Sequence, residues 1–111
     1  GDVYKRQIRM TPEAKVKKAV KAVLDALGAY YTMPVTGGYG KQGVPDFLVC
    51  YCGRFIGIET KAGKGKVTTL QELNLEKIRQ AGGVSLVIRE NDLELLKQRL
   101  YEIELGEFIC Q

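Results

Sequence analysis

Two carboxylates and a lysine stand at the ends of neighbouring apolar segments in this chain. Asp46 directly precedes one apolar run, and Glu59 and Lys61 close the next one. Gly53 lies between the two runs, a pattern that predicts an antiparallel β-hairpin. Because side chains alternate along a strand, we expect Asp46, Glu59 and Lys61 on one face at one end of this hairpin.

Two registers of the hairpin are compatible with the sequence. A turn at Cys52–Gly53 places Asp46 opposite Glu59, and a turn at Gly53–Arg54 places Asp46 opposite Lys61. Cross-strand neighbours lie about 5 Å apart at Cβ. Two carboxylates at that separation repel each other unless a cation lies between them. Since Mg²⁺ takes oxygen ligands and is often held by one or two carboxylates, the pattern points to a divalent metal site.

The alternative interpretation is an ordinary surface hairpin. A Glu-x-Lys triplet is common on solvated strands, and an aspartate after Pro45 is often a turn or cap residue. The two runs here are nearly all apolar, however, which indicates burial on both faces. On a solvated face the charges would alternate along the strand, whereas here they gather at one end, and this favours the metal site.

Length and composition limit the classes of protein. The chain has 111 residues, with 45% hydrophobic and 27% charged residues, which is typical of one globular domain. It has no histidine, which excludes histidine general acid–base catalysis, Ser-His and Cys-His nucleophile pairs, and histidine-ligated zinc. No apolar run approaches the roughly 20 residues of a membrane span. The sequence has no secretory signal, and an odd number of cysteines fits a reducing compartment. We therefore expect a cytoplasmic protein of a bacterium or a phage-infected cell. Cys50 and Cys52 share a strand face, and a core position is favoured over a metal or redox pair.

Hydrophobic periodicity and cap residues predict the order α-β-β-β-α-β-α. Helices are expected at 12–27, from 68 or 69 to about 81, and at 91–103, and strands at 30–35, in the hairpin and at 84–88. This order describes a small mixed sheet flanked by helices, an α/β fold. Residues 1–10 have no such pattern and are expected to be poorly structured. Residues 1–7 resemble a translated sequencing-adapter remnant, so a non-native origin and a native extension both stay open.

The apolar stripes of the helices predict which residues form the core. The residues expected inside are Val16, Val20, Val23, Leu24, Leu27, Leu70, Leu73, Ile78, Ala81, Leu93, Leu96, Leu100 and Ile103. The third helix offers two interpretations, because Leu95, Leu96, Leu100 and Phe108 could also form a surface for a second copy of the chain. Core positions for Leu96 and Leu100 are at least equally compatible with the pattern.

Basic residues cluster in places where phosphate contacts are conceivable. The net charge is +4, and the first helix carries Lys17 among several lysines. Lys64 and Lys66 lie in a short glycine-rich loop directly after Glu59 and Lys61, which favours phosphate contact over a merely solvated surface. The glycine-rich loop 36–43 carries Tyr39 and Lys41, where the backbone could approach a phosphate and Tyr39 could stack on a base.

The ordered set of motifs resembles one nuclease family. Gly43-Val44-Pro45-Asp46, Ile58-Glu59-Thr60-Lys61 and Thr69-Leu70-Gln71, followed by Gly82-Gly83, are similar to the PD-(D/E)XK nuclease superfamily. They are most similar to its VRR-NUC (virus-type replication-repair nuclease) branch. The similarity covers about 11–89. Thr60 departs from the valine that is usual between the glutamate and the lysine, and its side chain is expected to face away from the site.

The resemblance implies a fold and a set of roles. The fold is a restriction-endonuclease-like αβββαβ core, with residues 11–111 forming one VRR-NUC domain. Asp46, Glu59 and the Thr60 carbonyl would bind Mg²⁺ or Mn²⁺, with Glu13 as a third acidic residue, directly or through water. Lys61 would orient or deprotonate the attacking water and offset phosphate charge, and Gln71 would position Lys61 or the phosphate. From the residues alone, a favourable contact with the helix dipole is the preferred explanation of Glu13. Gln71 also fits a capping box that begins at Thr68, and that role is compatible with one at the site.

The resemblance predicts a Mg²⁺-dependent DNA endonuclease of phage or bacterial replication, recombination or repair. Stand-alone members resemble Holliday-junction resolvases, so branched DNA and a homodimer are expected. The alternatives are a flap or non-selective nuclease, a catalytically inactive nucleic-acid-binding module, and a structural subunit. The intact set Asp46, Glu59 and Lys61 argues against the inactive module. A structural subunit would show neither metal binding nor salt-dependent affinity for DNA.

Overall fold

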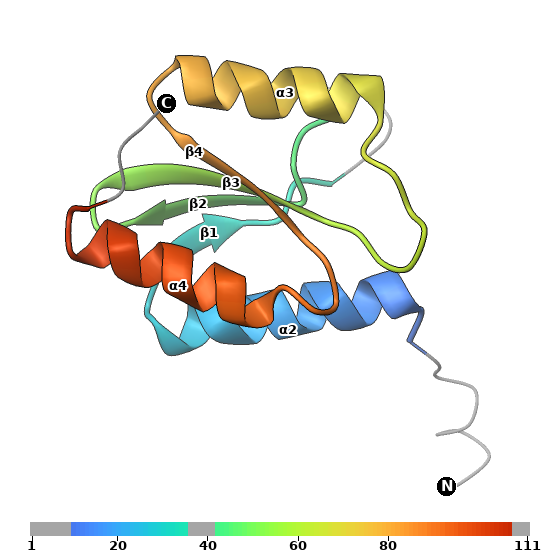
Figure 1. Ribbon diagram of the computed structural model, residues 1–111, viewed down its shortest axis with the longest axis horizontal. Coiled ribbons are helices and arrows are strands. Elements are labelled where there is room, and N and C mark those ends of the chain that lie inside the picture. Colours follow the sequence, from blue (N-terminus) through green and yellow to red (C-terminus); the bar gives the residue numbers. More distant parts are fainter. Residues whose placement is uncertain (1–9, 36–41, 108–111) are drawn as a thin grey trace, which may run out of the picture.

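A mixed sheet of four strands in the order β1-β2-β3-β4 forms the centre of the molecule (Figure 1). The strands are β1 (Tyr30–Thr32), β2 (Phe47–Tyr51), β3 (Arg54–Thr60) and β4 (Val84–Ile88). β1 and β2 pair antiparallel, as do β2 and β3, and β4 is parallel to β3. The computed structural model describes residues 10–35 and 42–107.

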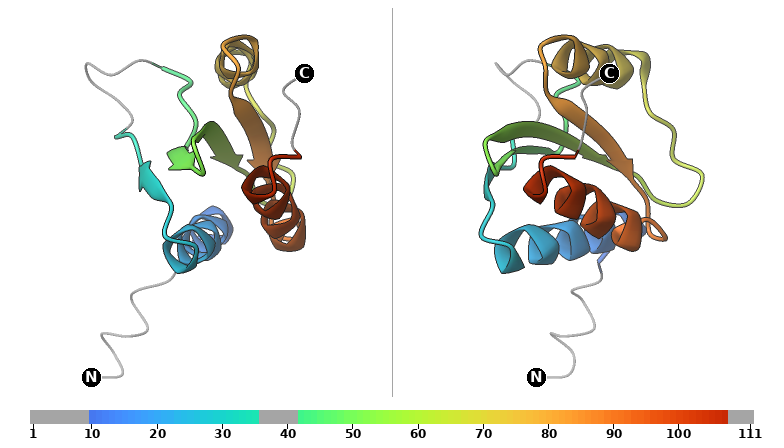
Figure 2. Two further views of the ribbon diagram at one scale, coloured as in Figure 1. Left: turned by 90° about the vertical axis from the view of Figure 1, so that its left-hand side faces the viewer. Right: turned by 60° about the vertical axis from the view of Figure 1, so that its left-hand side comes forward.

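The helices α2 (Pro12–Ala26), α3 (Thr69–Gln80) and α4 (Leu93–Glu104) cover the sheet. Figures 1 and 2 show α2 and α4 together on one face of the sheet and α3 on the opposite face. The order α-β-β-β-α-β-α and the mixed sheet between helices confirm the fold class predicted from the sequence. Within the described residues, none of these helices has the length and apolar character needed to cross a bilayer.

The hairpin adopts the first of the two predicted registers. Tyr51 pairs with Arg54, and Phe47 pairs with Ile58. The turn is Cys52–Gly53, with φ of 50° and 76°. Two successive positive φ values are typical of a type I′ turn, whose twist matches that of the flanking strands. Continued past its last pair, this register places Asp46 opposite Glu59.

The core lies between the sheet and the α2–α4 layer. Its buried members come from α2, β2, β3, β4 and α4, and they are Val16, Val20, Leu24, Phe47, Val49, Ile56, Ile58, Val84, Leu86, Ile88, Leu96, Leu100 and Ile103. Leu96 and Leu100 are fully buried, so the core interpretation is confirmed and the interface interpretation of these two residues is wrong. Leu95 is exposed, and Phe108 lies outside the described residues.

Some predicted core residues are on the surface. Leu70 and Leu73 are 47% and 46% exposed, because α3 turns Asn74 and Leu75 toward the protein interior instead. Leu27 is 40% exposed as the C-cap of α2, one residue beyond the helix. Cys50 and Cys52 are exposed, so their predicted core position is wrong.

Two element boundaries differ from the prediction by two residues or more. The strand expected at 30–35 has only three residues, because β1 pairs with β2 only over Leu48–Cys50. The last helix begins at Leu93 instead of 91, because the Asp92 carboxylate accepts the Arg89 N–H at 2.9 Å in a turn before it. Local side-chain to backbone hydrogen bonds of this kind compete with helix formation.

The segment before Asp46 is fixed against α3. Asn74 Nδ2 donates to the carbonyls of Leu70 (2.8 Å) and Gln42 (3.2 Å). Gly43 has a φ of 79°, and a Cβ there would lie 2.7 Å from the backbone C and O of Leu70. Only glycine satisfies both the conformation and the close approach, so this contact sets where the chain enters Asp46.

We predict that Gly43→Ala destabilises the protein more than Gly53→Ala. Both residues have left-handed φ values, which cost a non-glycine residue about 1–2 kcal/mol. A Cβ at Gly53 meets nothing within 4 Å, whereas at Gly43 it meets the backbone of α3 and should cost a further 1–3 kcal/mol or so. Urea unfolding of both variants measures the difference, and equal losses would contradict the proposed contact.

Candidate metal centre

The Asp46 carboxylate accepts a backbone hydrogen bond directly beyond the end of the β2–β3 ladder. The last pair is Phe47 with Ile58, and beyond it the Thr60 N–H donates to Asp46 Oδ2 at 2.9 Å. The Thr60 hydroxyl donates to the same oxygen at 2.6 Å. The other oxygen, Oδ1, lies 3.7 Å from Lys17 Nζ. Asp46 is thus fixed through one oxygen, and the second faces a cation.

The prediction that the Thr60 side chain faces away from the site is wrong, because its hydroxyl donates to Asp46. By the alternation of side chains along β3, Thr60 lies on the same face as the core residues of that strand, and it is fully buried. A buried hydroxyl needs a hydrogen-bond partner, and the nearby Asp46 carboxylate supplies one. Sequence alternation gave the strand face correctly but could not place the Asp46 side chain, which lies beyond the end of β2.

Glu59 is a buried carboxylate with one oxygen engaged. Its exposed fraction is 1%. Oε2 accepts hydrogen bonds from Gln71 Nε2 at 3.0 Å and pairs with Lys61 Nζ at 3.1 Å. Oε1 is buried and has no hydrogen-bond partner among the described residues. Burial, and next the negative charge of Asp46, raise the pKa of Glu59 above its ordinary value, although Lys61 acts in the opposite direction.

Glu13 joins these two carboxylates from the first turn of α2. One oxygen from each of Glu13, Asp46 and Glu59 can be chosen so that all three lie within 4.8 Å of one another. The Thr11 side chain caps α2 by accepting the Ala14 N–H at 3.1 Å, which fixes the helix start that carries Glu13. Glu13 itself is exposed, so the cluster opens to solvent on the α2 side.

The donor set fits a hard divalent cation. Three carboxylates from different elements converge, and a buried carboxylate oxygen without a partner is costly unless a cation binds it. Mg²⁺ and Mn²⁺ favour such oxygen ligands, and a site open on one side leaves room for the waters that Mg²⁺ retains. Cys50 and Cys52 are exposed at the hairpin, and the three-residue cluster detected in the described part of the chain does not include them.

Gln71 links the start of α3 to Glu59. Its Oε1 accepts the Thr68 N–H at 2.9 Å, and its backbone N–H donates to Thr68 Oγ1 at 3.2 Å, which completes a capping box. The same side-chain amide donates through Nε2 to Glu59 Oε2. The helix cap therefore fixes the orientation of the amide that donates to Glu59, so the capping box and a role at the site are compatible. The contact of this amide is with Glu59 and not with Lys61, which the resemblance implied.

The basic loop after Lys61 is attached to the β4–α4 turn. Both carboxylate oxygens of Glu90 accept the Gly63 N–H, at 3.1 and 3.2 Å. Arg89 donates to the Gly63 carbonyl at 3.4 Å. Lys64 and Lys66 on this loop are exposed, as nucleic-acid contacts would be.

Two other predicted contacts, Tyr39 and Lys41, lie outside the described residues. Lys17, predicted as a third contact, instead pairs with Asp46 and is partly buried. The sequence gave no signal for that pair beyond the position of Lys17 one helical turn after Glu13, on the same side of α2.

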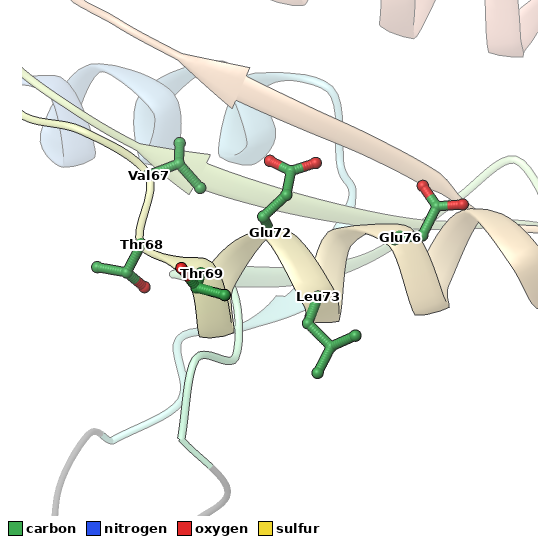
Figure 3. A pocket seen from close by; sticks show the side chains of 6 residues that line it. All are labelled: Val67, Thr68, Thr69, Glu72, Leu73 and Glu76. Carbon is green, nitrogen blue, oxygen red and sulfur yellow. The ribbon is translucent and has the colours of Figure 1, made fainter.

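A separate hollow lies along the outer side of α3. Figure 3 shows it lined by Val67, Thr68, Thr69, Glu72, Leu73 and Glu76. The carboxylates of Glu72 and Glu76 are paired with Arg79, at 3.3 and 2.7 Å. The cluster of Glu13, Asp46 and Glu59 does not line this hollow, so it is not part of the candidate metal centre.

The chain is similar to a solved structure described as a VRR_NUC domain. The two share 27% sequence identity and superpose with a TM-score of 0.66. The match covers 80% of this chain and 97% of the other. No protein-family model and no curated protein matches the sequence. The structural match confirms the predicted VRR-NUC fold.

We predict that Gln71→Ala weakens divalent-metal binding while Thr68→Ala does not. Both variants remove part of the capping box and should lose about 1 kcal/mol of stability. Only Gln71→Ala also removes the donor to Glu59, and loss of such a supporting contact typically lowers metal affinity by about tenfold or more. Titration with Mn²⁺, followed by electron paramagnetic resonance, measures the affinity. Equal affinities of the two variants would contradict a role for Gln71 at the site.

We predict that Glu59→Gln stabilises the protein at neutral pH in EDTA. The pKa of Glu59 is raised in the folded protein, so its contribution to stability is present at acidic pH and is lost as pH rises through that pKa. The amide cannot ionise, so the advantage of the variant should be largest near pH 7.5 and should vanish below about pH 4. Urea unfolding of both proteins at the two pH values tests this, and a pH-independent difference would contradict it.

Proposed function

We propose, from the premise that this chain has the VRR-NUC fold, that it is a metal-dependent nuclease that hydrolyses phosphodiester bonds in DNA. The observation that carries the proposal is the buried Glu59 oxygen without a partner in the described structure, beside the carboxylates of Asp46 and Glu13. A buried carboxylate oxygen without a partner destabilises a purely structural subunit, whereas in a metal site the cation satisfies it. The structural neighbour described as a VRR_NUC domain supports the reaction class.

Each residue of the site has a role that follows from its contacts. Glu13, Asp46 and Glu59 would hold the cation, with the Thr60 carbonyl beside them. When bound, Mg²⁺ or Mn²⁺ lowers the pKa of water and neutralises charge on a phosphoryl oxygen. Lys61 is held by Glu59 at 3.1 Å and would orient the attacking water and offset the phosphate charge.

Other residues would orient this centre and its substrate. Gln71 keeps Glu59 in place through the α3 cap. Lys64 and Lys66 would contact the DNA backbone from the loop that Glu90 holds, because both lysines are exposed beside the centre. Tyr39, Lys41 and Lys17 are proposed as further contacts; Lys17 could reach a phosphate only after it leaves Asp46.

The proposal extends to the substrate and the assembly. We propose branched DNA as the substrate, because the resemblance to VRR-NUC nucleases extends to junction resolvases. Each chain has one acidic cluster in its described part, so paired cuts on two strands would need a homodimer. A role in the cytoplasm of a bacterium or of a phage-infected cell, in replication, recombination or repair, follows from the same resemblance. Mg²⁺ is proposed as the physiological ion because it fits the oxygen ligands.

We predict metal-dependent cleavage that depends on the cluster. Labelled four-way junction, flap, duplex and single-stranded DNA are incubated with Mg²⁺, Mn²⁺ or EDTA. Asp46→Asn and Lys61→Ala should lower the cleavage rate by about 10²-fold or more, because the first weakens binding of the cation and the second removes a positive charge, and both cations stabilise charge at the reacting phosphate. Lys97→Ala is the matched control, since it removes one lysine from an exposed pair with Glu94 on α4.

The substrate panel separates the possible outcomes. Paired, symmetric cuts in the junction that disappear with EDTA would support the junction-selective homodimer. Cleavage of flaps or of all substrates would keep the nuclease and reject junction selectivity. DNA binding without cleavage, unchanged in Asp46→Asn, would reject the nuclease in favour of an inactive binding module.

A further inference from the structure

We propose that Thr60 is a positioning residue whose hydroxyl sets which oxygen of Asp46 faces the metal ion. The inference rests on the proposed metal site and goes beyond it, because the sequence pattern assigned only the Thr60 carbonyl to that site. The Thr60 side chain is not proposed as a ligand of the metal ion. It acts through Asp46, to which it donates two hydrogen bonds.

The geometry distinguishes the two oxygens of Asp46. Oδ2 accepts the Thr60 N–H at 2.9 Å and the Thr60 hydroxyl at 2.6 Å. Oδ1 has its described charged contact with Lys17 Nζ at the longer distance of 3.7 Å. One donor alone would let the carboxylate pivot about that bond, whereas two donors from one residue fix its plane. Asp46 therefore presents Oδ1, and not Oδ2, as its cation-binding oxygen.

The two carboxylate oxygens of Glu59 differ in the same way as those of Asp46. Its Oε2 is engaged by Gln71 and Lys61, and its Oε1 is left without a partner among the described residues. Each strand-end carboxylate thus has one oxygen tied to protein donors and one oxygen available to a cation. Donors that hold the non-binding oxygen orient a metal ligand before the ion arrives, which reduces the cost of ordering it.

Burial makes the Thr60 hydroxyl dependable as a donor. Thr60 has no exposed surface. Ile58, two residues earlier on β3, and Ile88, its partner on β4, are equally buried. A hydroxyl in such surroundings cannot exchange its partner for bulk water. A hydrogen bond from a hydroxyl to a carboxylate is also among the stronger types. Valine has nearly the same shape and retains the N–H, so Thr60→Val removes the hydroxyl contact alone.

The test compares Thr60→Val, Thr60→Ala and Thr60→Ser with the unmodified chain and with Asp46→Asn. Mn²⁺ affinity is measured by electron paramagnetic resonance, folding by thermal unfolding in EDTA, and DNA cleavage as a function of Mn²⁺ concentration. Thr60→Val should bind Mn²⁺ about tenfold more weakly, and Thr60→Ser should restore the affinity to within about threefold. At saturating Mn²⁺ the cleavage rate of Thr60→Val should recover, whereas that of Asp46→Asn should not.

Three results would overturn the inference in distinguishable ways. If Thr60→Val, or Thr60→Ala should Thr60→Val not fold, binds Mn²⁺ like the unmodified chain, the hydroxyl does not position Asp46. If Thr60→Ser is as weak as Thr60→Val, the effect is packing and not hydrogen bonding. If the unmodified chain binds no more Mn²⁺ than Asp46→Asn, the metal site of the proposed function fails, and the Thr60 inference fails with it.

Discussion

The candidate site depends on unequal strand lengths in the hairpin. β2 begins at Phe47, while β3 continues through Thr60, so the backbone of β3 extends past its partner. The Asp46 carboxylate accepts the Thr60 N–H that the ladder leaves unpaired. Because β4 lies on the other side of β3 and pairs with it as far as Ile88, this strand end is buried, and a buried N–H must be satisfied. The same interaction that completes the sheet thereby places one carboxylate beside Glu59.

Burial of Glu59 is costly, and its surroundings show how that cost is limited. Desolvation and the charge of Asp46 disfavour the ionised carboxylate, which the raised pKa expresses. Lys61 and Gln71 compensate only at Oε2. Functional sites often retain such locally unfavourable features, because the binding of a ligand relieves them. A cation between the carboxylates would reverse both unfavourable contributions, since it would satisfy the second oxygen and screen Asp46.

Sequence reasoning reached the site through patterns that depend only on local geometry. Strand alternation, a glycine turn and ordered motifs suffice to bring Asp46, Glu59 and Lys61 to one end of the sheet, and cap chemistry identified the start of α3. The exposed positions of Cys50, Leu70 and Leu73 were not predictable in the same way. They depend on α3 packing mainly against β3 and β4, and that tertiary choice leaves no periodic signal in a short helix. The Thr60 contact was missed for a related reason, since it joins a strand residue to a side chain beyond the strand.

Two of the site's side chains, Glu13 and Gln71, lie in the first turns of helices. Glu13 follows the Thr11 cap of α2, and Gln71 is itself part of the α3 cap. A helix start is fixed by cap hydrogen bonds as well as by packing, so a side chain there has less positional freedom than one on a loop. Both starts meet at the strand end where Asp46 and Glu59 lie, and each brings a polar group to a different part of the cluster. A chain without histidine can therefore assemble an ordered oxygen-rich centre from capping residues and strand ends alone.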